Sequence, residues 1–325
     1  MKGKYSIRIE NKRLRYDLVI HRNITVIRGD SATGKTTLIG MLQSYERDGA
    51  SSGISIVCEK QCLVIDGIRW KENIRSISDS IVFIDEHNRF IESEEFASEI
   101  RNTDNYYVLI TRSSLSNLPY SVDEIYGIHT SGKYHDLKKT YNEMYRIYSD
   151  FSSRYDNVLR LISEDSNSGF EFFKGIVKND VKCLSAGGKS NISRMLLNMP
   201  CDKKTAVIAD GAAIGPEIEK IIELKKNGYE LLLYLPESFE WIILRSGLIK
   251  DRYIDQVLSE PESYIDSREY FSWERFFSDL LIRVTDNSYY KYSKSALNKV
   301  YLQQKEKKAI VEVLPAQIKN MVKED

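Results

Sequence analysis

One stretch decides the fold of this chain: Gly29-Asp30-Ser31-Ala32-Thr33-Gly34-Lys35-Thr36. It follows the pattern GxxxxGK plus Ser or Thr, directly after an apolar run at 24–28, and it opens a segment with helical spacing of apolar residues at 35–46. Glycines let backbone N–H groups wrap a phosphate without hindrance from a Cβ, and a helix N-terminus favours negative charge. These residues, with Thr37, are therefore the candidate ATP-binding segment. We expect Lys35 to reach the β- and γ-phosphates and the Thr36 hydroxyl to ligate Mg²⁺.

A second apolar run, residues 80–84, ends in the carboxylates of Asp85 and Glu86. A continuous apolar run is typical of a strand covered on both faces. By itself such a run is more often a strand that simply meets solvent. Beside the phosphate-binding pattern, however, it predicts that Asp85 holds Mg²⁺ and that Glu86 orients the attacking water as general base.

A third strand is predicted at 106–110, after a helix at 92–101, and it ends in Thr111. A polar residue at this point could sense the γ-phosphate, which makes Thr111 the third catalytic candidate beside Lys35 and Glu86. Threonine also caps strands without any catalytic role, so both interpretations remain open.

The regions around these motifs predict further elements. Alternating residues at 5–9 and 14–20 indicate an antiparallel hairpin, and the runs at 54–58 and 61–65 indicate a second one. Tyrosine-rich text between 133 and 162 has apolar residues at helical spacing and predicts a connecting helix or helix pair. The polar stretch at 163–169 is the best candidate for a domain boundary.

Residues 1 to about 130 resemble a P-loop NTPase of the branch with a catalytic glutamate, with Walker A at 29–36 and Walker B at 81–86. The N-terminal hairpin resembles that of ABC-type ATPase heads. The short interval between Lys35 and Asp85 leaves no room for the helical insertion and signature motif of those heads. The resemblance therefore implies a compact ATPase core.

The second half predicts a small parallel α/β unit, with strands at 181–184, 205–209 and 230–235, helices at about 189–198 and 216–226, and mostly helical text after 238. The segment 183–192 allows three interpretations. It could be an ABC signature, because Leu184 to Gly188 resembles LSGGQ; the first strand and turn of a Toprim domain; or a plain turn between strand and helix.

The Toprim resemblance covers more of the sequence, because residues 209–218 resemble the DxD segment of that family and 233–237 resemble the next strand tip. It implies that Asp210 is a metal ligand, since hard Mg²⁺ ions require clustered oxygen ligands. Leu184 or Ser185 stands where the family has a glutamate, and Ala212 replaces the second aspartate. The resemblance is therefore to a degenerate Toprim-like domain. Glu217, Glu237 and Glu240 are carboxylates that could rebuild a metal site, although helix starts favour acidic residues in any case.

Composition limits the possible partners. The 325 residues carry 47 Lys and Arg against 47 Asp and Glu, so nucleic acid could bind only through a local patch. The basic, aromatic stretch at 289–299 is the best candidate for one, although a helix packed on the α/β unit explains it more simply. The four scattered cysteines favour reduced thiols. No apolar run approaches the roughly 18 residues of a membrane span, so we expect a cytoplasmic protein without membrane contact.

The expected fold class is thus α/β: a P-loop NTPase domain (1–132), a helical connector (133–168), and a smaller parallel α/β, Toprim-like domain with a helical C-terminal extension (169–325). The expected function is Mg²⁺-dependent ATP binding and hydrolysis that controls the C-terminal module, in nucleic-acid processing or phage defence. Two alternatives remain: an active ATP-dependent metal nuclease, and a nucleotide-gated scaffold with little hydrolysis. A homo-oligomer or a partner protein is compatible with each of them.

Overall fold

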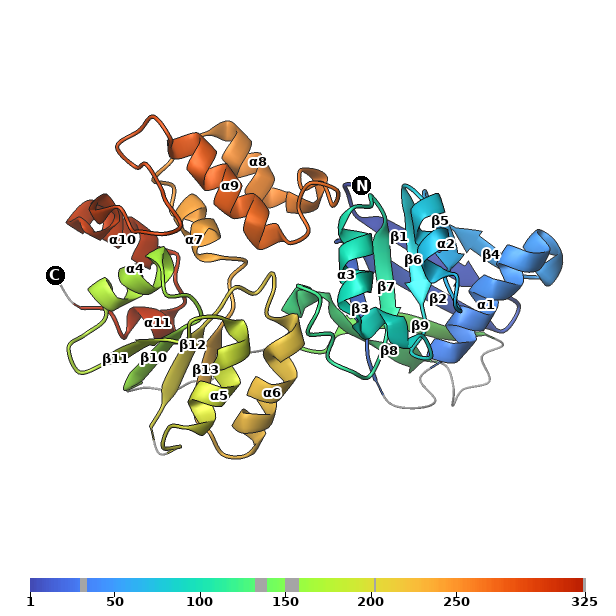
Figure 1. The fold of residues 1–325 in the computed structure, drawn as a ribbon, viewed down its shortest axis with the longest axis horizontal. Helices are drawn as coiled ribbons and strands as arrows, with labels where there is room; N and C mark the ends of the chain where they lie inside the picture. Colours follow the sequence, from blue (N-terminus) through green and yellow to red (C-terminus); the bar gives the residue numbers. More distant parts are fainter. Residues whose placement is uncertain (30–33, 132–138, 150–157, 202, 324–325) are drawn as a thin grey trace. The chain divides into compact units, whose positions relative to one another are not determined.

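The computed structural model describes residues 1–29, 34–131, 139–149, 158–201 and 203–323. The chain is mixed α/β, as the sequence predicts, and it divides into two compact units (Figure 1). The first unit comprises residues 1–149 and 260–271, and the second comprises 150–259 and 272–325. The chain therefore leaves the first unit and returns to it once, at 260–271.

The first unit is built on a sheet that has nine strands among the described residues, in the order β4-β1-β2-β9-β8-β3-β7-β6-β5. The strands are β1 (Tyr5–Glu10), β2 (Leu14–Ile20), β3 (Ile24–Ile27), β4 (Ser55–Val57), β5 (Gln61–Val64), β6 (Ser80–Ile84), β7 (Tyr106–Ile110), β8 (Ile125–Ser131) and β9 (Thr140–Arg146). The predicted hairpin of β1 and β2 is confirmed, because the two pair antiparallel along their length. Strands β3, β6 and β7 are buried throughout and pair in parallel.

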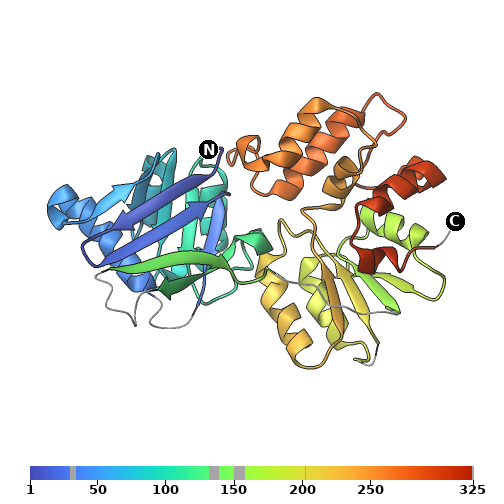
Figure 2. The same ribbon diagram turned by 180° about the vertical axis from the view of Figure 1, so that it is seen from behind.

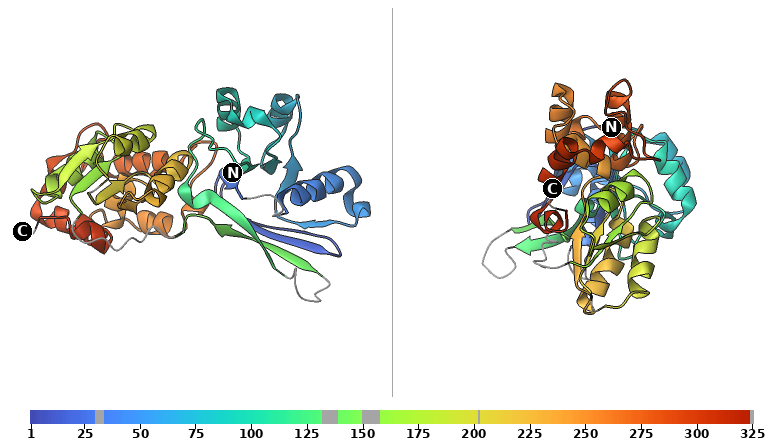
Figure 3. Two further views of the ribbon diagram at one scale, coloured as in Figure 1. Left: turned by 90° about the horizontal axis from the view of Figure 1, so that it is seen from below. Right: turned by 90° about the vertical axis from the view of Figure 1, so that its left-hand side faces the viewer.

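The sheet curls around helix α1 (Lys35–Asp48), as the left view of Figure 3 shows. Apolar side chains of α1, such as Leu38 and Leu42, pack in one core with Ile7 of β1 and Phe83 of β6. Helices α2 (Trp70–Ser76) and α3 (Glu94–Arg101) belong to the same unit and pack against each other. The curl brings strands from both halves of the sheet onto a single helix.

The predicted second hairpin is wrong. β4 pairs with β1 and β5 pairs with β6, so the two strands lie at opposite ends of the strand order. The polar dipeptide between them resembles a tight turn, but the backbone groups of each strand find partners on a different edge of the curled sheet. A local pattern cannot distinguish these two outcomes.

The predicted helical connector at 133–168 is also wrong where the structure describes it. Residues 140–146 form β9, which pairs antiparallel with β8 and parallel with β2, and residues 160–163 form β10. Residues four apart, such as Tyr141 and Tyr145, share a face in a strand as well as in a helix, which explains the error. The proposed boundary at 163–169 instead holds the end of β10 and the start of helix α4 (Ser168–Ile176).

The returning segment, residues 260–271, is bound to the first unit by specific contacts. The backbone N–H of Gly3 donates to the Glu262 carbonyl at 2.7 Å, and the Asn23 side chain donates to the Phe271 carbonyl at 3.0 Å. The Arg101 guanidinium lies 5.2 Å from the centre of the Phe271 ring. This segment is thus an integral part of the first unit, despite its position late in the sequence.

The second unit has a parallel sheet in the order β11-β10-β12-β13, formed by β10 (Arg160–Ser163), β11 (Lys182–Ser185), β12 (Thr205–Ile208) and β13 (Leu231–Tyr234). Its helices are α4, α5 (Ile192–Leu197), α6 (Gly215–Lys226), α7 (Phe239–Arg245), α8 (Arg252–Ser259), α9 (Trp273–Thr285), α10 (Gln304–Glu312) and α11 (Ala316–Lys319). α4 packs on β10 and β11, α5 lies beside α6, and α7 packs against α9 (Figure 2). The predicted parallel α/β unit is confirmed, with β10 as a strand that the sequence pattern did not reveal.

Candidate functional site

Three predicted site segments of the first unit directly follow the carboxyl ends of three neighbouring parallel strands, β3, β7 and β6. Ile27 of β3 is level with Ile110 of β7, and Ile84 of β6 is level with Leu109. Parallel strands in register place their carboxyl ends side by side. The segments that begin at Arg28, Asp85 and Thr111 therefore emerge together, with β7 between the strand of the glycine-rich segment and the strand of the carboxylates.

The described ends of the glycine-rich segment have backbone conformations that favour glycine. Gly29 and Gly34 have φ angles of 133° and 83°, which other residues adopt only with strain. The Lys35 ammonium donates to the Gly29 carbonyl at 2.8 Å, so the Lys35 side chain links the two described ends of the segment. No side chain caps the first turn of α1 among the described residues. Asp30, Ser31, Ala32 and Thr33 lie outside the described residues, and Thr36 and Thr37 are exposed.

The two carboxylates after β6 have different surroundings. The Asp85 side chain is buried, and its Oδ1 accepts the backbone N–H of Glu86 at 2.8 Å. Glu86 is half-buried, and its Oε2 lies 3.2 Å from the Arg112 Nε at the end of β7. Arg112 thereby restrains the direction of the Glu86 carboxylate. A buried Asp85 and an exposed Thr36 hydroxyl are oxygen donors of the kind that Mg²⁺ prefers.

Thr111 is buried, and its hydroxyl accepts the backbone N–H of Ser113 at 3.0 Å. Its own N–H donates to the Ile27 carbonyl at 3.2 Å, which extends the β3–β7 ladder. These contacts account for Thr111 as a residue that ends a strand. Its role as a γ-phosphate sensor stays a prediction.

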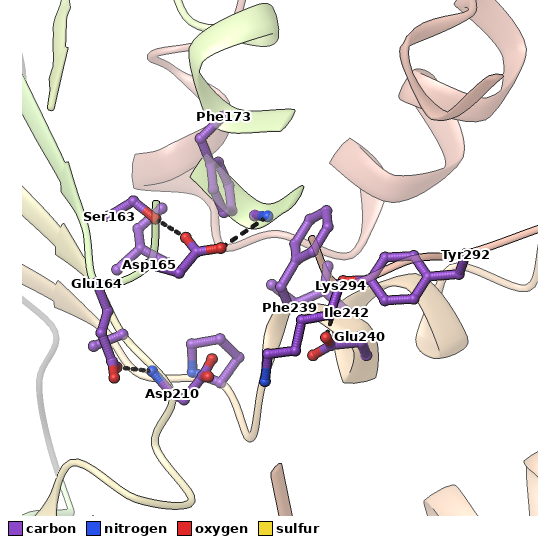
Figure 4. Close-up of a pocket in the computed structure, with 14 residues that line it drawn as sticks. Ser163, Glu164, Asp165, Phe173, Asp210, Phe239, Glu240, Ile242, Tyr292 and Lys294 are labelled. Atoms are coloured by element: carbon purple, nitrogen blue, oxygen red, sulfur yellow. Dashed lines mark hydrogen bonds between the residues drawn. The ribbon is translucent and has the colours of Figure 1, made fainter. Parts of the chain in front are cut away.

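The second unit holds a pocket at the carboxyl ends of its parallel strands (Figure 4). The Glu164 Oε2, directly after β10, accepts the backbone N–H of Asp210, directly after β12, at 2.9 Å. The pocket is lined by Ser163, Glu164, Asp165, Gly169, Phe173, Ile208, Ala209, Asp210, Pro236, Phe239, Glu240, Ile242, Tyr292 and Lys294. Glu164 is thus the acidic neighbour that sequence analysis of Asp210 missed.

A lysine from the C-terminal extension enters this acidic pocket. In Figure 4 the Lys294 amine lies between the carboxylates of Asp210 and Glu240. It donates to the Glu274 Oε1 at 2.5 Å, and Glu274 belongs to the first turn of α9. Glu240 is buried and accepts the Tyr292 hydroxyl at 2.9 Å. The pocket therefore combines the carboxylates of Glu164, Asp210 and Glu240 with the ammonium of Lys294, and the half-buried ammonium of Lys189 also interacts with Glu164 and Asp210.

The pKa values of this pocket reflect burial and crowding. Burial raises the pKa of Glu164 to about 7. Burial, and then the charges of Glu274 and Glu164, raise the pKa of Asp210 well above its ordinary value. Burial acts to lower the pKa of Lys294, but the carboxylates of Glu240 and Glu274 outweigh it, so the pKa of Lys294 is raised. Perturbed pKa values in a pocket favour a functional site.

Of the other predicted carboxylates, Glu240 lines the same pocket as Asp210, whereas Glu217 and Glu237 do not. Glu217 is buried in the first turn of α6 and pairs with Lys220 at 2.9 Å, and neither it nor Glu237 lines the pocket. Leu184 and Ser185 lie on or at the end of β11, the edge strand, which is not where a glutamate would face Asp210. Across the described part of the chain, no three His, Cys, Asp or Glu side chains are grouped so that they could hold a metal ion.

The basic, aromatic stretch at 289–299 is not a single exposed surface. Tyr292 is buried and Lys294 lines the pocket, whereas Tyr289 is exposed and its hydroxyl donates to Gln303. The apolar residues of α9 are all buried: Trp273, Phe276, Phe277, Leu280 and Leu281. The central residues of this stretch are thus buried in the unit, but the predicted helix is wrong, because α9 ends at Thr285 and the next helical turn begins only at Lys299.

Comparisons with protein-family models and with curated proteins found no match. No helix among the described residues is both long and apolar enough to cross a membrane.

Proposed function

We propose that the first unit is a Mg²⁺-dependent ATPase. The observation that carries this proposal is the common sheet edge at which the glycine-rich segment, Asp85 and Thr111 emerge from parallel strands in register. Ligands of open α/β sheets bind at the carboxyl ends of the strands, and this edge presents both a phosphate-binding pattern and a pair of carboxylates.

The proposed mechanism assigns each residue one task. Lys35 exchanges the Gly29 carbonyl for phosphate oxygens, which its long side chain can do without a change in the helix. Thr36 and Asp85 would hold Mg²⁺, which would supply positive charge to the phosphates. Glu86, held by Arg112, orients the attacking water and accepts its proton.

The test is ATP binding and phosphate release by the full chain. Lys35→Ala is expected to lose ATP binding. Glu86→Gln is expected to bind ATP normally and to release phosphate roughly 10²-fold or more slowly. Glu92→Gln is the matched control, because Glu92 is an exposed glutamate after the same strand. If Glu86→Gln binds ATP and leaves phosphate release unchanged, hydrolysis through Glu86 is wrong and a nucleotide-gated scaffold becomes the better proposal.

For the second unit we propose a Toprim-like module that the nucleotide state of the first unit controls. Glu164 supports this proposal, because it follows a central strand and lies beside Asp210, as the glutamate and aspartate of that family do. The resemblance to prokaryotic fusions of an ATPase with a Toprim domain makes nucleic acid the proposed substrate and phage defence the proposed setting.

Metal-dependent cleavage of nucleic acid is the second candidate activity, and the Glu164–Asp210 pair favours it. Two carboxylates can start a metal site, and a nucleic-acid phosphate could complete it. Cleavage of plasmid DNA or RNA should require Mg²⁺ or Mn²⁺ and should be lost in Asp210→Ala and Glu164→Gln. Asp180→Asn, an exposed position in the same unit, should cleave normally. Intact substrate with every metal would exclude the nuclease and leave the ATPase proposal standing.

A further inference from the structure

Two cysteines of the first unit lie close together at a place that the ATPase proposal does not use. Cys58 directly follows β4, and Cys62 is part of β5. Both thiols are free, and both side chains are partly buried against the hydrophobic core that α1 shares with the sheet. Their neighbourhood is thus fixed by the packing of the core rather than by an exposed loop.

The backbone of Lys60 holds both sulfur atoms. Its N–H donates to the Cys58 sulfur at 3.4 Å, and its carbonyl accepts the Cys62 thiol at 3.8 Å. Because both sulfur atoms bond to the backbone of one residue, the two thiols lie close together, and each affects the pKa of the other. The Lys60 ammonium points elsewhere, because it pairs with Asp79 at 2.5 Å. Lys60 therefore brings the two thiols together through its backbone and not through its ammonium group.

We propose that Cys58 and Cys62 are a redox-active dithiol, which a small disulfide compound converts into an intramolecular disulfide. The proposal rests on the shared Lys60 backbone that holds both thiols, and it does not depend on ATP binding. It makes the junction of β4 and β5 a site of reversible covalent modification.

The chemistry assigns the two cysteines different roles. The neighbouring Cys62 side chain lowers the pKa of Cys58 to about 7, so a substantial share of Cys58 is thiolate at neutral pH. The Cys58 side chain, followed by burial, raises the pKa of Cys62, which stays protonated while Cys58 is reduced. Cys58 is thus the attacking thiol and Cys62 the resolving thiol.

The reaction balances with one equivalent of the small disulfide. The Cys58 thiolate attacks one sulfur atom of the small disulfide compound. This breaks the S–S bond of that compound and releases one half of it as a thiolate. The proton of Cys62 then passes to solvent, and its thiolate attacks the Cys58 sulfur and releases the second small thiolate. Both cysteines are oxidised, and the small disulfide is reduced to two thiols.

A Cys58–Cys62 disulfide would lie in the short connection between β4 and β5, two strands that pair with different partners in the sheet. β4 ends on β1 and β5 begins on β6, at opposite ends of the strand order. β5 also contacts α1, where the Val64 N–H donates to Glu46 at 3.4 Å. A covalent bond at this junction would tie the start of β5 to the end of β4.

The experiment treats the folded full-length protein with oxidised glutathione, alkylates the remaining thiols and maps the peptides by mass. The expected product has lost two hydrogens, contains a Cys58–Cys62 linked peptide and carries no glutathione on either residue. Cys62→Ala is expected to accumulate glutathione on Cys58, because the resolving thiol is absent. The double variant Cys183→Ser, Cys201→Ser, which keeps the pair, should behave like the unmodified chain.

Two results would overturn the proposal. One is full alkylation of both Cys58 and Cys62 after the treatment, and the other is stable glutathione on Cys58 in the unmodified chain. A second measurement uses the unmodified chain alone, so it does not depend on whether a variant folds. The rate of Cys58 alkylation should rise with pH around a midpoint near 7, and a midpoint near 8.5, that of an ordinary thiol, would contradict the assigned role of Cys58.

Discussion

The Tyr16 hydroxyl of β2 donates a hydrogen bond to the Gly34 carbonyl at 2.9 Å, and so ties the N-terminal hairpin to the start of α1. Tyr16 is only 1% exposed. Its hydroxyl also interacts with the side chain of Thr37. A residue far from the glycine-rich segment in sequence thus fixes the end of that segment from which Lys35 and Thr36 follow.

Tyr16→Phe should weaken ATP binding, because it removes this hydrogen bond and keeps the ring in the core. The loss of one such bond, about 1 kcal/mol, corresponds to roughly five-fold weaker binding if the segment loses its shape. Isothermal titration with ATP measures the effect. Tyr107→Phe is the control, since Tyr107 is an equally buried tyrosine whose hydroxyl contacts Thr103 instead. Equal affinities of the two variants would show that Tyr16 only stabilises the fold.

Gly34→Ala should destabilise the first unit. The φ angle of Gly34 is 83°, and a Cβ there would lie 2.7 Å from the Tyr16 hydroxyl oxygen. Strain and contact together should cost about 1–3 kcal/mol in the free energy of unfolding. Gly40→Ala, within α1, meets nothing within 4 Å and should be neutral or stabilising.

The same two positions allow a double-mutant cycle. With Phe at position 16, the nearest remaining ring atom is 3.6 Å from the added Cβ, an ordinary contact. The cost of Gly34→Ala should therefore be smaller in the Tyr16→Phe background, as measured by chemical denaturation. If Gly34→Ala costs the same free energy of unfolding in both backgrounds, the cost comes from backbone strain alone.

Glu164→Gln should change how stability depends on pH. The folded chain holds the Glu164 proton up to a pKa of about 7, whereas an unfolded glutamate releases it near 4.5. The folded state therefore binds more protons between these values, and this group's contribution to stability is lost as pH rises from about 4.5 to 7. Glutamine cannot ionise and can still accept the Asp210 N–H. The variant should gain stability relative to the unmodified chain above pH 7, and denaturation across pH 4 to 8 measures this. A gain that is the same at every pH would contradict the assignment.

Lys294→Met should destabilise the second unit, and more so at pH 8 than at pH 5. Lys294 interacts with the carboxylates of Glu274, Glu240 and Asp210, and Asp210, whose pKa is raised well above its ordinary value, takes up a proton as the pH falls. Because the Lys294 side chain is 42% exposed, we expect a loss of about 1–2 kcal/mol at pH 8. Lys291→Met is the control, since Lys291 is more exposed and pairs with Asp286 at the surface. An equal loss at both pH values would mean that Lys294 contributes packing rather than charge.

Much of the first unit could be predicted because its signals are local. The alternation in β1 and β2, the apolar runs of β3, β6 and β7, and the start of α1 at Lys35 each depend on neighbouring residues only. In the second unit, β11, β12 and β13 could be predicted for the same reason, because each is a local apolar run. Glu164 was missed because its strand is short and precedes a polar stretch that resembles a linker.

The sequence by itself determined which residues are candidates for chemistry in each segment: the glycine-rich turn with Lys35, the carboxylates after β6, and Asp210. Only the tertiary structure decided which segments meet. It separated β4 from β5, made 140–146 a strand, placed Glu164 beside Asp210 and brought Lys294 among the carboxylates. The physical reason is that a strand's partner and a pocket's charges come from residues far away in the chain, so no local spacing of residue types can specify them.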